Sequence, residues 1–318
     1  MRAVVIYSAR DLRIEEVEVP RPHPGWALVK TEFAGICGTD KAFYIGTYKL
    51  FKSPLILGHE VVGRVVEGPE NFVGQRVVPE INFSCGRCWY CRSGLYTHCP
   101  HKRTLGIDFD GGMAEYFVAP PEALHIFPGP PEKGVFVEPL AAVLRAFSLK
   151  PPRPGDRAAI IGSGTLAWLA VQVLRKLFNL DVDVVARRDS VKAEHFKSLA
   201  NVVYEDSVEE NAYDIVFEAS GNPEALDTAI KIAKPMGVIH LKSTPGSKAC
   251  ANITTAVVKE LAVITSRCGT FREFSLATKL ILEGVIEPKI SSVFPLDRAV
   301  EAFEESLKRH SFRVLLKP

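Results

Sequence analysis

Four cysteines in one short segment place the strongest constraint on how this chain folds. Cys85, Cys88, Cys91 and Cys99 follow the pattern C-x2-C-x2-C-x7-C, and they are four of the seven cysteines in the chain. Thiolates at this spacing can surround one zinc ion tetrahedrally and so close a loop. Because such a site leaves no position open for a substrate, its role is structural. An iron–sulfur cluster is the alternative, since ferredoxins use similar spacings.

Three further residues, far apart in the sequence, suit a second zinc ion. Cys37 lies in Gly-Ile-Cys-Gly-Thr-Asp, His59 lies in Gly-His-Glu, and Glu138 opens Glu-Pro-Leu. The apolar run Leu55–Leu57 before His59 predicts a short strand that leads into a turn. Each residue alone is more often an ordinary core or surface residue. Together, a thiolate, an imidazole and a carboxylate leave one position on zinc open to water or substrate.

The composition is that of an ordinary globular protein. The 318 residues are enough for two domains, and the hydrophobic and charged fractions are 47% and 24%. The formal net charge of +2 gives no support for nucleic-acid binding. No apolar run approaches the roughly 20 residues that span a bilayer, and the N-terminus lacks the apolar core of a signal peptide. We therefore expect a cytoplasmic protein with no membrane or nucleic-acid partner.

Residues 1 to about 147 predict a β domain. This region consists largely of short strand-like runs that are separated by glycine and proline. The pattern is typical of an antiparallel or barrel-like sheet. The clearest runs are Ala3–Tyr7, Trp26–Phe33, Val61–Glu67 and Gln75–Glu80.

A glycine-rich turn indicates a second domain. After the stiff segment Pro151–Asp156, the strand-like run Arg157–Ile161 leads into Gly-Ser-Gly-Thr-Leu-Ala and then into a helical pattern over Trp168–Leu177. Strand, glycine turn and helix in this order are the context in which G-x-G-x-x-G/A binds a dinucleotide. The glycines let the backbone approach the pyrophosphate, which the helix N-terminus attracts. The residues expected to contact the cofactor here are Gly162, Ser163, Gly164, Thr165 and Leu166.

The end of the next strand bears on which dinucleotide is used. The strand Val182–Ala186 ends in Arg187 and Arg188, whereas an NAD site usually has an acidic residue here that binds the ribose 2′-hydroxyl. Arginine pairs bidentately with phosphate. The two arginines therefore favour NADP, with NAD possible and with a solvated turn as the simpler interpretation.

Strands and helices alternate along the rest of this region, which predicts a parallel, doubly wound sheet of the α/β class. The expected strands are Tyr213–Glu218, Val238–Lys242 and Ala262–Ser266, and the expected helices are Pro223–Lys234, with Asn222 as its cap, and Phe274–Glu283.

The tail, Ile290–Pro318, predicts a helix at Leu296–Lys308 and a last strand at Phe312–Leu316. We expect that strand to return to the first domain. The predicted division is therefore a catalytic domain of residues 1–147 and 290–318 and a dinucleotide-binding domain of residues 148–289.

These motifs together resemble the zinc-containing medium-chain alcohol dehydrogenases. The resemblance covers nearly the whole chain and rests on Cys37–Asp40, Gly58–Glu60, Gly111–Tyr116, Glu138–Leu140, the four-cysteine segment and the 162–167 turn. It implies a GroES-like β domain combined with a Rossmann domain. The carboxylate at Glu138 resembles the branch of polyol, sugar and threonine dehydrogenases.

The resemblance also implies roles for individual residues. Cys37 and His59 would bind a catalytic zinc, Glu60 would bind it or support a ligand, and Glu138 would bind it directly or through water. Thr39 would pass the substrate proton toward solvent. One catalytic and one structural zinc are expected, in a homodimer or homotetramer. The remaining residues expected to contact the cofactor are Ser220, Gly221, Cys268 and Arg313.

The function that follows is oxidation of a secondary alcohol, polyol, sugar or hydroxy amino acid by hydride transfer to nicotinamide. The alternatives are a zinc-stabilised nucleic-acid-binding protein, an iron–sulfur electron carrier and a zinc-free quinone reductase of the same fold. The low net charge and the dinucleotide turn argue against the first alternative. The last would leave Cys37 and His59 without a role.

Overall fold

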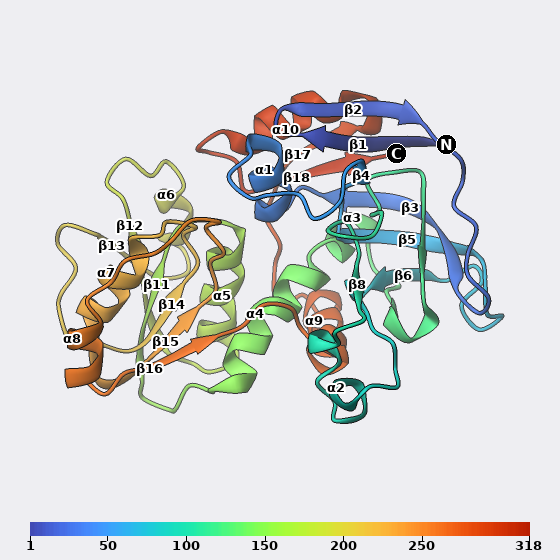
Figure 1. Cartoon of the computed structure of the whole chain (residues 1–318). Helices are drawn as coiled ribbons and strands as arrows, with labels where there is room; N and C mark the ends of the chain where they lie inside the picture. Colours follow the sequence, from blue (N-terminus) through green and yellow to red (C-terminus); the bar gives the residue numbers. More distant parts are fainter.

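A computed structural model describes all 318 residues of the chain. Figure 1 shows a β-rich part that contains both chain termini, an α/β part beside it, and helices α4 (Val137–Leu149) and α9 (Phe271–Leu282) between the two. The expected combination of a β domain with a parallel α/β domain is confirmed.

The β-rich part is built from two main sheets. In the smaller sheet the strand order is β2-β1-β4, and in the larger it is β10-β6-β5-β3-β18-β17, with β9 also paired to β3. The strands are β1 (Arg2–Ser8), β2 (Asp11–Glu16), β3 (Ala27–Gly35), β4 (Leu55–Ile56), β5 (Glu60–Glu67), β6 (Arg76–Pro79), β9 (Tyr116–Ala119), β10 (Leu124–Ile126), β17 (Ile290–Pro295) and β18 (Arg313–Lys317). A third, two-stranded sheet pairs β7 (Asn82–Phe83) with β8 (Arg103–Thr104) next to the four-cysteine segment.

The last strand returns to this part of the molecule, as the sequence predicts. Strand β18 pairs antiparallel with β3, so that Leu315 lies opposite Gly35. The larger sheet therefore contains strands from both ends of the chain. Helix α10 (Ala299–Leu307) precedes β18 and follows a 3-10 turn at Leu296–Arg298, which replaces the first turn of the helix expected from Leu296.

The α/β part contains one six-stranded sheet in which every neighbouring pair is parallel. Its order is β13-β12-β11-β14-β15-β16. Chain order reverses between β11 and β14, and ligands of such sheets bind at the carboxyl ends of the strands at this reversal. The strands are β11 (Arg157–Ile161), β12 (Asp181–Ala186), β13 (Asn201–Tyr204), β14 (Tyr213–Glu218), β15 (Ala233–Leu241) and β16 (Ala262–Thr265).

Several element boundaries differ from the sequence-based expectation. Helix α5 (Thr165–Lys176) begins before its apolar pattern does, because its first turn is the end of the glycine motif. Helix α7 (Ala225–Ile232) is shorter than predicted, and Asn222 is not its cap because Glu224 occupies that position. Strand β13 was not predicted, since it is a short edge strand with no fully buried residue. The other helices are α1 (Gly38–Ile45), α2 (Trp89–Arg92), α3 (Pro131–Gly134), α6 (Ala193–Phe196) and α8 (Ile253–Val258).

Helix α4 joins the two parts through one continuous core. Ten of its residues are buried, including Leu140 and Val143, which pack in a cluster that also contains Val62 of β5 and Ile160 of β11. Burial of an apolar side chain contributes roughly 1.5–3 kcal/mol, so this shared core stabilises the relative position of the two sheets.

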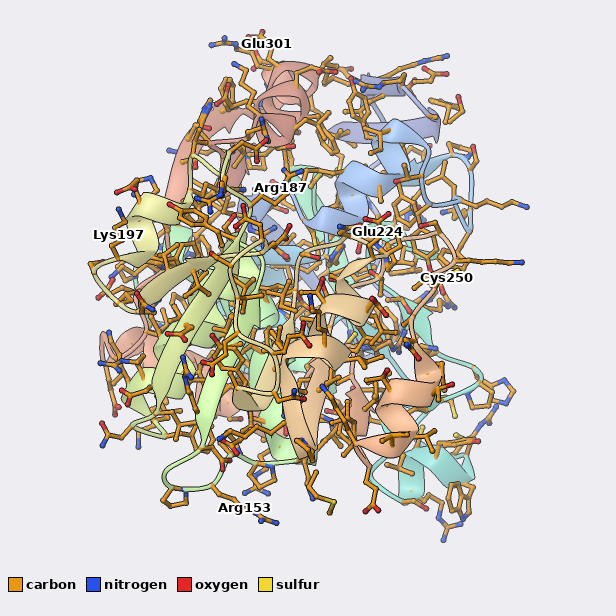
Figure 2. All side chains as sticks on the ribbon, turned by 90° about the vertical axis from the view of Figure 1, so that its left-hand side faces the viewer. Arg153, Arg187, Lys197, Glu224, Cys250 and Glu301 are labelled. Atoms are coloured by element: carbon orange, nitrogen blue, oxygen red, sulfur yellow. The ribbon has the colours of Figure 1, made fainter.

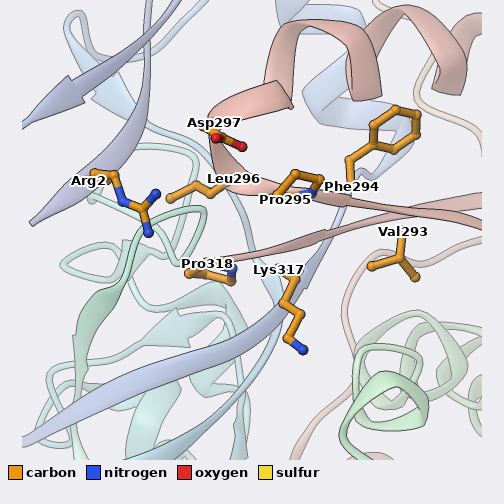
Figure 3. Close-up of a pocket in the computed structure, with 8 residues that line it drawn as sticks. All are labelled: Arg2, Val293, Phe294, Pro295, Leu296, Asp297, Lys317 and Pro318. Carbon is orange, nitrogen blue, oxygen red and sulfur yellow. The ribbon is translucent and has the colours of Figure 1, made fainter.

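A surface groove of about 380 Å³ lies where the two ends of the chain meet. Figure 3 shows its lining, which comes from β1, the end of β17, the turn between β17 and α10, and the end of β18. None of the residues predicted to bind zinc or cofactor lines this groove, so it is separate from the predicted metal and cofactor sites. No helix of the structure is long and apolar enough to cross a membrane.

Replacing His240 with leucine is expected to weaken the pH dependence of stability. This residue of β15 is 1% exposed and packs edge-on against Phe147, and burial lowers the pKa of His240 to about 4, which the backbone of Lys150 offsets only in part. In the unfolded chain the pKa of this histidine is near 6.5, so between about pH 4 and pH 6.5 the unfolded chain binds more protons than the folded one. Stability contributed by His240 is present above pH 6.5 and is lost as the pH falls, by about 2 kcal/mol between pH 7 and pH 5.

Urea unfolding of the wild type and the His240→Leu variant at pH 7 and pH 5 measures this contribution. The wild type should lose more free energy of unfolding than the variant over that interval. Equal losses would show that His240 does not titrate in this way.

Candidate metal centres and dinucleotide site

The pairing of β3 with β5 brings three of the predicted metal-binding residues together. Gly35 lies opposite Glu60 in this ladder, so Cys37, two residues after β3, comes close to the start of β5. The possible ligand atoms of Cys37, His59 and Glu60 all lie within 4.8 Å of one another. His59 and Glu60 are 4% and 1% exposed. This grouping of a thiolate, an imidazole and a carboxylate depends on strand register, which sequence spacing does not reveal.

Asp40 lies beside two members of this group, although the sequence predicted no role for it. Cys37 is the N-cap of α1, and its backbone N–H donates to Asp40 Oδ2 at 2.8 Å. Asp40 Oδ1 lies 3.6 Å from His59 Nδ1, which is too far for a hydrogen bond, and neither atom has another hydrogen-bond partner. A carboxylate therefore faces the Nδ1 edge of the ring, in the place where such groups support histidine ligands of metals. The spacing of Asp40 three residues after Cys37, typical of a capping box, is the signal that could have found it.

Arg313 lies directly behind the same group. Its Nη1 atom is 2.8 Å from Glu60 Oε2 and donates to the carbonyl oxygen of Ile36 at 2.7 Å, and the residue is 4% exposed. Its guanidinium holds Glu60, so β18 supplies a positive charge to the interior of the catalytic part. The cofactor contact expected for Arg313 stays a prediction.

Glu138 lies in the first turn of α4 and is 6% exposed. It is not part of the compact group formed by Cys37, His59 and Glu60. Burial raises the pKa of Glu138, and the charges of His59 and Lys242 act in the opposite direction. Glu138 is therefore close enough to interact with His59 electrostatically, while Glu60 is the carboxylate that shares the compact group.

The donor set fits a zinc ion. Burial raises the pKa of Asp40, Glu60 and Glu138, because charged carboxylates are costly in an interior of low polarity. A divalent cation beside these groups favours their charged forms. A cysteine, a histidine and a carboxylate are also the ligand types that zinc prefers. The side chains of the chain therefore form a catalytic Cys/His/Glu zinc site.

The four cysteines of the Cys85–Cys99 segment, called the cysteine lobe below, form the second site. The Sγ atoms are 3.4 Å apart for Cys88 and Cys91, 3.5 Å for Cys85 and Cys99, 3.7 Å for Cys88 and Cys99, and 3.9 Å for Cys85 and Cys91. A tetrahedral site with Zn–S bonds of about 2.3 Å requires edges of about 3.8 Å. The separations exclude disulfides. They are also short for a cluster whose thiolates bind different irons, so the lobe fits one structural zinc.

Replacing Cys88 with serine is expected to remove this zinc and to lower stability. Loss of a structural metal typically costs several kcal/mol, and each kcal/mol shifts the melting temperature of a chain this large by about 1.5 °C. We therefore expect a decrease of roughly 5 °C or more and a fall in zinc content from two ions per chain to one, measured by thermal unfolding and metal analysis. Cys250→Ser is the control, because Cys250 is exposed and lies outside both metal groups. A Cys88 variant that retained two zinc ions would contradict the assignment.

The glycine turn has the geometry that a dinucleotide site requires. Gly162 has φ = 115°, and a Cβ atom there would lie 2.9 Å from the Cα of Ser220, so only glycine fits this close approach to the end of β14. A Cβ atom on Gly164, by contrast, would meet nothing within 4 Å. Gly164 is the N-cap of α5, and the open space therefore lies at a helix N-terminus, where anionic groups are favoured. Ser220 and Gly221 are both exposed at this edge of the sheet.

The two arginines after β12 have different surroundings. Arg188 forms a short ion pair with Asp206 and stacks on Tyr204, with its guanidinium carbon 5.0 Å from the ring centre. Arg187 has only a 3.7 Å contact with Asp189, a carboxylate that also pairs with Arg309. Figure 2 shows Arg187 at the end of the α/β part opposite to Arg153, which precedes β11. Arg187 is thus the more available cation at the carboxyl edge of the sheet.

Two lysines extend this positive region toward the metal group. Burial and the charge of Arg187 lower the pKa of Lys192. Burial, followed by the charges of Arg313 and Lys192, lowers the pKa of Lys41 to about 8. The hydrogen bonds of their Nζ atoms go to backbone carbonyls, of Ser306 for Lys41 and of Ser311 for Lys192. Neither has a carboxylate partner among the ion pairs, and an anionic ligand would relieve their mutual repulsion.

Comparisons with known proteins agree with this geometry. Residues 23–129 match the alcohol dehydrogenase GroES-like domain, and residues 166–283 match the zinc-binding dehydrogenase domain. The chain is 32% identical to L-threonine 3-dehydrogenase of Pyrococcus horikoshii, over 91% of this chain and 90% of that protein.

Two solved structures are similar over the whole chain. A zinc-binding dehydrogenase from Sinorhizobium meliloti 1021, bound to NADP, has a TM-score of 0.90 and 30% identity and covers 100% of this chain and 99% of its own. The rspB protein of Escherichia coli CFT073, complexed with NADH, has a TM-score of 0.90 and 27% identity with the same coverage.

The chain belongs to the zinc-containing medium-chain dehydrogenase family. It combines the GroES-like domain with a Rossmann-like domain, as the sequence predicted. It is a zinc-dependent, NAD(P)-linked dehydrogenase whose substrates fall in the class of alcohols, polyols and threonine. The expectation of an enzyme is confirmed.

Proposed function

We propose that this enzyme oxidises the secondary hydroxyl group of a polyol, a sugar or a hydroxy amino acid and that it prefers NADP to NAD. The observation that carries the cofactor preference is the cationic region formed by Arg187 and Lys192, which follow β12, and Lys41 of α1. Neither lysine pairs with a carboxylate, and Arg187 has only a 3.7 Å contact with Asp189. Buried carboxylates around Cys37 and His59 support a zinc-assisted oxidation at this site.

The proposed reaction divides the work between cofactor, metal and protein side chains. Zinc supplies Lewis acidity that polarises the substrate hydroxyl and lowers its pKa. Cys37, His59 and Glu60 would hold the metal, with Glu138 as a further ligand or as a support through water. Thr39, a half-buried residue in the first turn of α1, would accept the proton of the substrate hydroxyl and pass it toward solvent. A bound nicotinamide would supply the acceptor for the hydride of the carbinol carbon, and the protein would orient substrate and cofactor and exclude water.

We also propose an assembly and a division of the chain. The catalytic domain would comprise residues 1–147 and 290–318, and the dinucleotide-binding domain residues 148–289, in agreement with the membership of the two large sheets. A homodimer or homotetramer is supported by apolar side chains that remain exposed near the edge strand β16 of the parallel sheet. These are Met236, Ile253, Val257, Val258 and Val263.

Replacing His59 with alanine is expected to reduce turnover to below about 1% of wild type, because a group that acts only through the reacting centre typically contributes a factor of 10² or more. The cysteine lobe should keep its zinc, so metal content should fall by one ion per chain while the thermal transition remains cooperative. Steady-state kinetics and metal analysis measure both effects. His101→Ala, at an exposed histidine, is the control. Normal turnover in the His59 variant would remove the basis for a catalytic zinc here.

Replacing Arg187 with aspartate is expected to reverse or erase the cofactor preference. A guanidinium stays charged at any working pH and attracts the 2′-phosphate, whereas a carboxylate repels it and accepts hydrogen bonds from a free 2′-hydroxyl. Loss of one charge-assisted contact of about 1.5–3 kcal/mol corresponds to a change of roughly 10- to 150-fold in the ratio of kcat/KM for NADP to kcat/KM for NAD. The ratio must be measured at fixed ionic strength, because salt screens phosphate contacts.

A matched pair of variants tests the assignment of Arg187. Arg187→Gln should lower the ratio by about tenfold or more. Arg188→Gln should change it much less, since Arg188 is already engaged by Asp206 and Tyr204. A wild-type ratio that favours NAD would overturn the proposed preference. A screen of polyols, aldoses, threonine and simple alcohols with both cofactors then selects the substrate.

A further inference from the structure

The segment Ser266–Phe271 leads from the last parallel strand, β16, to helix α9. It begins at the carboxyl end of that strand, on the edge of the sheet where dinucleotides bind. Cys268, in its middle, interacts electrostatically with Glu138. Gly269 packs so closely on α4 that a Cβ atom would lie 2.7 Å from the Cβ of Ala141, one turn after Glu138. The segment therefore lies between the cofactor edge of the sheet and the catalytic metal group.

Residues of the cysteine lobe hold this segment from one side. The Nη2 atom of Arg267 donates to the carbonyl oxygen of Thr97 at 2.7 Å and to Asn82 Oδ1 at 3.0 Å. The backbone N–H of Phe271 donates to the hydroxyl oxygen of Tyr96 through a short hydrogen bond. Thr97 and Tyr96 belong to the lobe itself, between Cys91 and Cys99, so their positions depend on the closed four-cysteine site.

Buried groups fix these contacts in turn. The Tyr96 hydroxyl donates to Glu80 Oε2 at 2.6 Å, and Glu80 Oε1 is 3.1 Å from His125 Nε2. Glu80 and His125 are 3% and 7% exposed, and the ring of His125 packs against Phe271 and Phe274 at centroid distances of 4.8 and 5.3 Å. Leaving one member of such a buried hydrogen-bond network without its partner costs free energy. Tyr96 therefore has one strongly preferred position.

The parallel-sheet side holds the same segment through Lys242, at the end of β15. This lysine is 8% exposed, and its Nζ atom donates to the carbonyl oxygen of Ser266 at 3.1 Å and, through a short hydrogen bond, to that of Arg267. Arg267 is thus bound by its side chain to the lobe and by its carbonyl oxygen to the Rossmann-like sheet. A shift of the lobe would move the segment relative to Lys242 and Glu138.

We propose that the cysteine lobe is a positioning element for cofactor binding, acting through Arg267 and Tyr96 on the Ser266–Phe271 segment. The inference rests on the proposed function only in that it requires a nicotinamide dinucleotide at the carboxyl edge of the parallel sheet. The lobe then has two effects: its zinc stabilises the fold, and its contacts set the affinity for the nicotinamide half of the cofactor.

The test measures equilibrium binding of NADPH and NADH to the zinc-loaded full chain by fluorescence titration, together with zinc content and thermal unfolding. Arg267→Ala and Tyr96→Phe should each raise the Kd by about tenfold or more. Both nucleotides should be affected equally, because they differ only in the 2′-phosphate. The proposed function places that phosphate beside Arg187 after β12, on the other side of β11 from this segment. Zinc content should remain at two ions per chain, and Arg267→Lys should recover part of the affinity. The matched controls are Arg92→Ala and Tyr90→Phe, at exposed residues of the same lobe.

A lobe that serves stability alone would give a different pattern. Arg267→Ala and Tyr96→Phe would then lower the melting temperature but bind both nucleotides within twofold of wild type, and that result would overturn the inference. A wild type that bound neither nucleotide would overturn the proposed function instead. A wild type that preferred NADH would contradict only the proposed role of Arg187, since the lobe acts on both cofactors alike.

Discussion

The buried contact between Arg313 and Glu60 is the interaction on which the catalytic part of this structure depends. It joins the last strand of the chain to the start of β5 and lies directly behind Cys37 and His59. Breaking a buried ion pair by removing one partner typically costs about 3–5 kcal/mol, because the other charge is left uncompensated. The pair therefore makes the positions of β3, β5 and β18 mutually dependent, and it places a positive charge among carboxyl groups that burial alone would favour in the neutral form.

Helix α4 makes the positions of the β-rich part and the α/β part depend on each other. It carries Glu138 in its first turn, contributes to the core of the parallel sheet and packs against the segment that contains Gly269. A catalytic metal group on the β-rich part and a dinucleotide turn on the α/β part thus share one rigid element. Hydride transfer needs the two reacting carbons about 3–3.5 Å apart, and a helix shared by both parts is a physically simple way to maintain that distance.

Much of this architecture could be predicted from sequence, and the exceptions have physical causes. Local patterns were enough for β14, whose predicted and observed bounds agree, and for the four-cysteine site, since both depend on neighbours in the chain. The role of Arg313 and the closeness of Glu60 to Cys37 depend on strand register between distant segments, which no local pattern contains. Strand β13 was not predicted, because an edge strand lacks the apolar run that identifies a central strand. Asp206 follows this strand, so its ion pair with Arg188 was not predicted either.

The position of β18 in the larger sheet also has a consequence for how the protein is made. The partner of strand β3, β18, is synthesised more than two hundred residues after it. All strands of the parallel sheet lie between the two in the sequence. At typical rates of synthesis that interval is on the order of tens of seconds. During this time the Rossmann-like domain can fold behind an N-terminal sheet that still has an open edge and an uncompensated Glu60. The catalytic centre is thus completed only after β18 has left the ribosome, so a chain interrupted before Arg313 lacks the charge that compensates Glu60.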